Sequence, residues 1–487
     1  MTATTTEIRT VKFFVNGRWE LARDREIHPV VNPATGEWIA QLPYAASEDV
    51  DRAARAAHQA FLTWRDLPVV ERCQVFFRFK NLLEKNFGEL AQLLSTENGK
   101  TLDDAKGSVR RAIQMVEMAC GMPSLMMGFS LDNVARGIDC QTIRQPLGVC
   151  AGITPFNFPA MVPMWMYPFA IACGNSFILK PSEKVPLTPT RAAELLEEAG
   201  LPAGVFNLVH GDKPAVDALL DHPLVRAISF VGSSPVAKYV YERGAAQGKR
   251  VQALGGAKNH LVVMPDADLE KTVEAIMGSA FGAAGERCLA GSVLVAVGDV
   301  AEPLLERLLE RARNLKVGDS AEPGTEMGPL VTAEHRRRVL SYIEKGEQEG
   351  ARPLCDGRRL MEERQDGFFL GPTIFDHVRP DMTIAREEIF GPVLSVIRVR
   401  TLEEAIQVVN GSRFGNTTAI FTADGRAARD FTQRIECGMV GVNIGVPAPM
   451  AFFPFSGWKQ SFFGDLHAHG RDAISFYTEQ KVILTRW

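Results

Sequence analysis

From residue 147 onward, short apolar runs alternate with amphipathic segments long enough to form helices. Strands joined by helices need crossover connections, which are right-handed and produce a parallel sheet with helices on both faces. We therefore predict an α/β fold with a doubly wound sheet, whose strands include 147–153, 176–180 and 227–233. A second run of this kind begins near residue 259. Nucleotides bind at the carboxyl ends of such strands.

The length of 487 residues, with 46% hydrophobic residues, exceeds one compact domain, so two domains are expected. We place their boundary near residue 256, within "ALGGAKNH". Residues 48–119 have helical periodicity and predict a helical layer. The segments 124–146 and 473–487 suit extended structure outside both sheets, where they either meet another subunit or form plain edge strands.

Charge and composition exclude several classes of protein. The formal net charge is -4, from 54 basic and 58 acidic residues, so no positive field indicates nucleic acid or an anionic membrane. The first residues have no apolar signal region, and the longest apolar stretch, 158–174, is interrupted by prolines, which predicts neither export nor membrane spanning. Eight scattered cysteines, without C-x-x-C or clustered histidines, predict no metal site and a reduced, cytoplasmic chain.

Two short stretches are candidates for a cofactor site, although the G-x-G-x-x-G fingerprint is missing. In "FVGSSP", Gly232 and Ser233 follow a strand and precede a helix whose free N–H groups can hold pyrophosphate. An ordinary turn with a Ser N-cap is the commoner meaning of such a stretch. In "LKPSE", Lys180, Ser182 and Glu183 leave a strand end, where Glu183 would repel a 2'-phosphate and favour NAD over NADP. An ordinary polar loop is the alternative.

The stretch "FGAAGERCLAG" places Arg287 directly before Cys288, among small residues that let a substrate approach the main chain. An arginine there can lower the pKa of the thiol through its charge, or bind a substrate carboxylate in bidentate fashion. Arg110 and Arg111, on a helix that precedes the first sheet, supply a second arginine. Solvent-facing helix charges are the alternative for this pair.

Seven motifs occur in the order and approximate spacing of the aldehyde dehydrogenase superfamily: "PFNFP", "KPSE", "FVGS", "GGAK", "GERC", "EEIFGPV" and "PFSGWKQS". The chain resembles that superfamily over essentially its whole length. The resemblance implies three parts, which are an NAD-binding domain (1–123 and 147–256), a catalytic domain (257–456) and a strand-built oligomerisation region (124–146 and 457–487).

The same resemblance assigns roles to individual residues. It makes Cys288 the nucleophile and Asn157 the side-chain donor of an oxyanion hole, to which the N–H of Cys288 would also contribute. The positions that match contacts to NAD are Phe156, Lys180, Ser182, Glu183, Gly232, Ser233, Glu388 and Phe390.

One departure indicates the subfamily. Hydrolytic members carry a glutamate four residues before the lysine of "GGAK" as the general base for water, whereas this chain has Leu254 there, or Ala253 if the match slides by one residue. A thiol such as that of coenzyme A needs less activation than water. Stretches such as "RRAIQMVE", "GAKNH" and "GERC" closely resemble the methylmalonate-semialdehyde dehydrogenases, in which Arg111 and Arg287 would hold the substrate carboxylate. Leu289 and Gly291 depart from the pattern of most members.

The resemblance thus implies oxidative decarboxylation of methylmalonate or malonate semialdehyde to propionyl-CoA or acetyl-CoA, with NAD as cofactor, coenzyme A as co-substrate and a homotetramer as the assembly. Two alternatives stay open: a hydrolytic semialdehyde dehydrogenase that gives a free acid, and a non-catalytic member of the fold. A dimer is the alternative assembly. Neither semialdehyde is favoured, because one methyl group in an apolar pocket is worth only about 1–3 kcal/mol.

Overall fold

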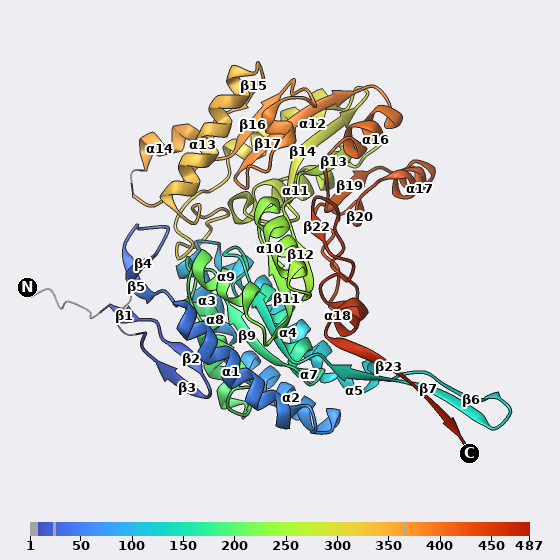
Figure 1. The fold of residues 1–487 in the computed structure, drawn as a ribbon. Helices are drawn as coiled ribbons and strands as arrows, with labels where there is room; N and C mark the ends of the chain where they lie inside the picture. Colours follow the sequence, from blue (N-terminus) through green and yellow to red (C-terminus); the bar gives the residue numbers. More distant parts are fainter. Residues whose placement is uncertain (1–7, 23–25, 365) are drawn as a thin grey trace, which may run out of the picture.

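The computed structural model describes residues 8–22, 26–364 and 366–487. Residues 1–7 and 23–25, which fall in the range predicted for the NAD-binding domain, and residue 365, in the catalytic range, lie outside this description. Two large sheets with helices around them form the body, and a narrow antiparallel sheet projects from it (Figure 1).

The first large sheet has eight strands and is parallel through its centre. In spatial order its strands are β22 (Phe462–Phe463), β12 (Arg250–Leu254), β11 (Val225–Val231), β8 (Val149–Ile153), β9 (Ser176–Lys180), β10 (Phe206–Leu208), β2 (Phe13–Val15) and β3 (Arg18–Glu20). The predicted doubly wound sheet is confirmed. Sequence reasoning missed β12 and the β2–β3 hairpin, because both are short and lack a distinctive pattern.

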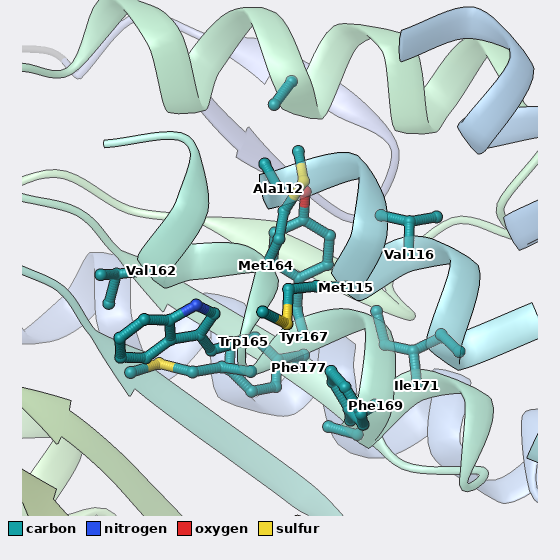
Figure 2. Close-up of a cluster of buried hydrophobic side chains, with 14 of the residues drawn as sticks. Ala112, Met115, Val116, Val162, Met164, Trp165, Tyr167, Phe169, Ile171 and Phe177 are labelled. Atoms are coloured by element: carbon teal, nitrogen blue, oxygen red, sulfur yellow. The ribbon is translucent and has the colours of Figure 1, made fainter. Parts of the chain in front are cut away.

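Helices cover this sheet through apolar stripes that face it. They are α1 (Ser47–Trp64), α2 (Val69–Lys85), α3 (Phe87–Asn98), α4 (Leu102–Cys120), α5 (Met122–Leu125), α6 (Met161–Met164), α7 (Tyr167–Ala172), α8 (Leu187–Glu198), α9 (Lys213–Asp221) and α10 (Ser234–Ala246). Figure 2 shows the core where α4, through Ala112, Met115 and Val116, meets the α6–α7 segment and Phe177 of β9. The helical layer expected over 48–119 is therefore present.

The second large sheet has seven strands, of which only the outermost pair, β15 and β16, is antiparallel. Its spatial order is β15 (Arg352–Cys355), β16 (Thr373–Asp376), β17 (Val393–Val399), β14 (Gly291–Val297), β13 (Asn259–Val263), β19 (Thr417–Phe421) and β20 (Met439–Val442). The helical elements between these strands are α11 (Leu269–Ala280), η1 (Gly282–Gly285), α12 (Ala301–Arg313), α13 (Ala333–Gln348), η2 (Gly357–Arg359), α14 (Leu360–Glu363), α15 (Thr383–Arg386), α16 (Leu402–Asn410) and α17 (Gly425–Arg434).

The third sheet is antiparallel, with the order β23 (Thr478–Arg486), β7 (Ile138–Pro146) and β6 (Ser130–Ala135). It joins the two segments that the sequence placed outside both large sheets, and it extends away from the body with the C-terminus (Figure 1). The remaining elements are α18 (Gly470–Phe476), a small sheet of β1 (Arg9–Thr10), β5 (Trp38–Pro43) and β4 (Ile27–Val31), and the pair β18 (Phe414–Gly415) and β21 (Trp458–Lys459). Among the described residues, no helix has both the length and the apolar character needed to cross a bilayer.

Candidate active site

A cavity of about 250 Å³ lies beside the N-terminal half of α4 and contains Cys288 in its wall. Apolar side chains from the core of Figure 2, Met115 and Trp165, form part of its lining. Its ionisable side chains are Lys100, Asp103, Asp104, Arg111, Arg287, Cys288 and His469. A small apolar chamber with a thiol and several charged groups suits a small, charged substrate.

The turn before Cys288 has an unusual main chain. Ala283 and Ala284 adopt φ angles of 50° and 53°, and Gly285 follows with 73°. A left-handed conformation costs an alanine roughly 1–2 kcal/mol. A side chain at Gly285 would place its Cβ 2.2 Å from the carbonyl oxygen of Gly391, so only glycine fits there. This strained turn aims Cys288 into the cavity, in keeping with the tendency of strain to occur at functional sites.

Two asparagines hold the carbonyl group of Cys288. Asn259 at the start of β13 donates from Nδ2 at 2.9 Å, and Asn416, just before β19, donates from Nδ2 at 2.8 Å. Asn259 also donates to the carbonyl of Ala290 at 2.9 Å. Neither asparagine was predicted from the sequence. The only available signal is that "KNH" and "GNTT" each place an asparagine at the start of a strand, and these two strands are neighbours in the sheet. The two asparagines fix the main chain of Cys288 to the second sheet.

Burial dominates the titration of the thiol. The pKa of Cys288 is raised to about 12, mainly by burial and also by the charge of Glu388, whereas the N–H groups of Cys288 and Leu289 and the charge of Arg287 act to lower it. The expected lowering by Arg287 is therefore present, but it is the smallest of these effects.

Arg287 is engaged by its neighbours. Its Nη2 forms an ion pair with Asp104 of α4, and its Nη1 donates to the carbonyl of Gly278 at 3.1 Å. The other oxygen of Asp104 accepts from the N–H of Ala283 at 3.1 Å. Asp104 thus joins α4 to the strained turn and also offsets the charge of Arg287.

Arg111 and Arg110 occupy different environments. Arg111 lines the cavity and donates from Nη2 to the carbonyl groups of Ala448 and Pro449, at 2.9 and 3.0 Å. Arg110 instead pairs with Glu84 at 2.6 Å on an exposed face of α4. Of the two arginines weighed from the sequence, only Arg111 reaches the cavity.

Asn157 is buried, and its Nδ2 donates at 3.0 Å to the carbonyl of Glu286, two residues before Cys288. The main-chain carbonyl of Asn157 accepts from Nζ of Lys100 at 2.6 Å. The main-chain carbonyl of Phe156 accepts from Nδ2 of Asn98 at 3.1 Å. The loop that carries Asn157 is therefore held by the last residue of α3 and by the turn that follows it, neither of which was predicted from the sequence.

A second cavity of about 580 Å³ lies between the first turn of α10 and the segment 387–388. Ser233 is the N-cap of α10 without a side-chain capping bond, and it lines this cavity together with Lys238 and Glu388. Glu388 accepts from the N–H of Ala257 at 2.9 Å, and burial raises its pKa to about 7. Gly232 donates its N–H to the carbonyl of Leu254 at 3.1 Å. Free N–H groups at the start of α10 and a nearby cation suit a pyrophosphate.

The "KPSE" side chains cluster at the end of β9. Lys180 is buried and donates to the carbonyl of Gly211 at 2.6 Å, while Glu183 lies 3.5 Å from its Nζ. Ser182 accepts from the N–H of Lys184 at 3.3 Å. Carboxylate and ammonium at a carboxyl strand end provide an acceptor and a donor for a ribose diol.

Phe156 and Phe390 meet edge to face, with ring centroids 5.8 Å apart, and Phe390 has a φ of 60°. The cofactor candidates thus come from the carboxyl ends of the first sheet and from the loop before β17. Leu254 ends β12 as a buried apolar side chain, so its position supplies no base to the cavity.

Comparison with known proteins decides the family. The Aldehyde dehydrogenase family matches residues 19–483. The chain belongs to the aldehyde dehydrogenase family. This membership, the α/β fold and the prediction of an oxidoreductase of this family are confirmed.

Relatives in the aldehyde dehydrogenase family cover nearly the whole chain. Malonate-semialdehyde dehydrogenase 2 of Geobacillus kaustophilus is 54% identical over 483 residues, which are 99% of this chain and 100% of that protein. The solved methylmalonate-semialdehyde dehydrogenase of Oceanimonas doudoroffii is 50% identical, with a TM-score of 0.97 and 99% of each chain covered. A Sinorhizobium meliloti protein assigned to the same activity, solved with NAD, is 47% identical, with a TM-score of 0.97 and 99% of each chain covered.

Proposed function

We propose that this aldehyde dehydrogenase oxidises methylmalonate semialdehyde and malonate semialdehyde with NAD and coenzyme A, releasing carbon dioxide and forming propionyl-CoA and acetyl-CoA. The observation that carries the proposal is one cavity lined by Cys288, Arg111 and Arg287, in a chain with leucine where hydrolytic members have a glutamate. The relatives named for these two semialdehydes support the substrate class.

In the first half of the reaction, the thiolate of Cys288 adds to the aldehyde carbon and forms a carbon–sulfur bond. Asn157 and the N–H of Cys288 are the donors for the negative charge that develops on the aldehyde oxygen. Arg287 binds the substrate carboxylate in exchange for Asp104, and Arg111 binds it while its Nη2 keeps the carbonyls of Ala448 and Pro449. NAD, held by the residues at the ends of β9 and β11, would supply the acceptor for the hydride of the former aldehyde carbon, and Cys288 would then carry the acyl group as a thioester.

In the second half, the substrate carboxylate lies beta to the thioester carbonyl. The carbon–carbon bond to that carboxylate breaks, carbon dioxide leaves, and the electron pair passes into an enolate that takes up one proton. The thiolate of coenzyme A then attacks the thioester carbonyl, and Cys288 leaves as a thiolate. Water competes poorly, because Leu254 cannot accept its proton.

NAD is the proposed cofactor. The support comes from the cavity at the start of α10, from Lys180 and Glu183 at the end of β9, and from the related protein solved with NAD. We propose that Phe156, Ser182, Gly232, Ser233, Glu388 and Phe390 also contact it. Glu183 disfavours the 2'-phosphate of NADP through charge repulsion.

We further propose a cytoplasmic homotetramer, built as a dimer of dimers through the third sheet. All eight cysteines are free thiols, as in a reducing compartment. The third sheet ends in the edge strand β23 and exposes Leu131, Val482, Leu484 and Trp487. An exposed edge strand with apolar side chains is typical of a contact with another subunit.

The test measures NADH formation from both semialdehydes with NAD, with and without coenzyme A, and identifies the acyl product by mass spectrometry. We expect a single-turnover burst without coenzyme A and steady formation of propionyl-CoA or acetyl-CoA with it. Steady turnover to a free acid without coenzyme A would contradict the proposal and favour the hydrolytic alternative. The Cys288→Ala variant, which should bind NAD but form no NADH, is the control.

A further inference from the structure

Lys100 carries a buried ammonium group in the wall of the cavity that contains Cys288. The residue is 3% exposed, its Nζ donates to the carbonyl of Asn157 at 2.6 Å, and it lies 4.1 Å from the centre of the Phe158 ring. A carbonyl group and a ring face compensate a buried charge only in part. The ammonium group therefore retains an electrostatic influence on its neighbours.

The two arginines of the cavity already form an ion pair or hydrogen bonds with other groups. Arg287 shares its charge with Asp104, and Arg111 donates to the carbonyls of Ala448 and Pro449. Within the described part of the chain, Lys100 forms no ion pair with a carboxylate. Its own titration is influenced by Asp104, Arg287, Glu286 and Cys288. Lys100 thus adds a deeply buried cation to the cavity wall that holds the thiol, besides Arg287, whose charge also acts on Cys288.

We propose that Lys100 is a positioning residue with two effects on the reaction centre: its ammonium group holds the main chain of Asn157, and its positive charge stabilises the thiolate of Cys288. The inference rests on the proposed function only in taking Cys288 as the nucleophile.

The turn that carries Lys100 is itself fixed. Gly99 has a φ of 88°, and a Cβ there would lie 2.7 Å from Pro33 and 2.8 Å from Pro329, so this position accepts only glycine. Glu97 accepts from the N–H groups of Leu187 and Thr188 at 2.7 and 2.8 Å, at the start of α8. The main chain at Lys100 is therefore held in one position, from which the side chain reaches the loop of Asn157.

The charge of Lys100 depends on pH in a way that can be measured. Burial lowers the pKa of Lys100 to about 8. Its stabilisation of the thiolate is therefore present below pH 8 and is lost as the pH rises above that value. The other charged or titratable groups that face Lys100, Cys288 or their cavity are Asp103, Asp104, Arg111, Glu286, Arg287, Glu388 and His469. Since these groups are unchanged in a Lys100 variant, their titration contributes similarly to both proteins.

The experiment follows alkylation of Cys288 by iodoacetamide between pH 6.5 and 10, by mass spectrometry of the peptide that contains Cys288, in the full chain. We expect Lys100→Met to react about tenfold more slowly than the wild type below pH 8. The two rates should converge above pH 9, because the wild-type amine is then neutral.

A ratio of the two rates that is constant with pH would overturn the electrostatic role, since a merely structural effect of Lys100→Met does not titrate. Lys100→Arg provides a second test, because arginine stays charged: its logarithmic rate should rise with one slope through pH 8, where the wild-type slope flattens. Equal profiles for this variant and the wild type would also overturn the inference.

Lys106→Met is the matched control. Lys106 lies on α4, the helix that follows Lys100, is half-exposed and pairs with Asp103 at 3.3 Å, so its removal should leave the rate within twofold of wild type. The assay uses neither semialdehyde nor coenzyme A. Unreactive Cys288 in every variant would count against the proposed function, whereas a reactive Cys288 with a flat ratio would count only against the role of Lys100.

Discussion

The guanidinium group of Arg287 and the carboxylate of Asp104 form an ion pair in the wall of the cavity that contains Cys288. The side chains are 19% and 23% exposed, so removal of one partner leaves a poorly hydrated charge. We expect Arg287→Leu to lower the free energy of unfolding by about 1–3 kcal/mol. The double variant Arg287→Leu, Asp104→Asn should recover most of this loss in urea unfolding. Equal stability of the single and double variants would show that the unpaired Asp104 carboxylate is not the cause of the loss.

The same pair gives a prediction about substrates. Arg287→Leu should reduce kcat/KM for methylmalonate semialdehyde by at least about a hundredfold, since a charged hydrogen bond contributes about 1.5–3 kcal/mol and two are lost. Propanal, which lacks a carboxylate, should lose less than tenfold. The double variant should not recover activity. A similar loss for both aldehydes would remove Arg287 from carboxylate recognition.

Arg111, which we propose binds the substrate carboxylate, also contacts a loop. Its two hydrogen bonds hold the carbonyls of Ala448 and Pro449 over the cavity. We expect Arg111→Leu to raise the KM for carboxylated aldehydes and to increase amide hydrogen exchange across residues 446–451. Arg110→Leu, on the exposed face of α4, is the matched control and should leave both measurements unchanged. Unchanged exchange in Arg111→Leu would show that other contacts hold the loop.

Asn259 and Asn416 both donate to the carbonyl of Cys288. We expect Asn416→Ala to lower kcat by about tenfold or more, because each hydrogen bond contributes about 1 kcal/mol and small displacements of a nucleophile are costly. The dissociation constant for NAD, measured by fluorescence quenching, should stay the same. A parallel loss of NAD affinity would mean that the substitution disturbs the fold rather than the nucleophile alone.

The left-handed alanines predict an uncommon response to glycine. At Ala284, relief of about 1–2 kcal/mol of strain should offset the entropy of glycine and the lost methyl group, so Ala284→Gly should leave the free energy of unfolding nearly unchanged. Ala112→Gly, at a buried position within α4, should cost about 1–2 kcal/mol. Chemical denaturation of both variants compares the two costs. An equal loss at both positions would contradict the strained conformation of the turn.

The high pKa of Cys288 predicts the behaviour of the free enzyme toward alkylating reagents. With a pKa of about 12, the thiolate fraction rises with pH throughout the range accessible to the protein. We expect the alkylation rate without NAD to keep rising from pH 6.5 to pH 10, with a shallower slope near pH 8 where Lys100 loses its proton. A plateau below pH 8 would show that the thiol is already ionised and that burial does not dominate its titration.

Much of the fold follows from local pattern. Runs such as 149–153 and 176–180 are mainly apolar because strands in the centre of a parallel sheet are buried on both faces. The amphipathic stretches between them have the period and length of crossover helices. The short strands of the β2–β3 hairpin carry too few residues for a pattern, and β12 runs directly into the segment chosen as the domain boundary.

The candidate site was predictable only in part. Cys288 and Asn157 lie in stretches whose motifs resemble a known family, and Leu254 is informative through the absence of a carboxylate. The partners that control these residues are separated from them by long stretches of chain. Asp104 and Arg287 are 183 positions apart, and Asn416 and Cys288 are 128 apart, and no local periodicity encodes such pairs. The sequence around Lys100 indicates an ordinary exposed lysine in a loop, and only the structure shows that it is buried.

The hydrogen bonds from Arg111 to Ala448 and Pro449 have a consequence for how the range of substrates can evolve. The guanidinium group contacts main-chain oxygens there, and every amino acid carries such an oxygen. Side chains at positions 446, 448 and 449 can therefore change size or polarity while the hydrogen bonds from Arg111 remain. Substitutions at these positions can change the shape of the cavity, and so the aldehyde that fits it, while the loop stays ordered. The fit of the substrate and the order of the loop can therefore change independently.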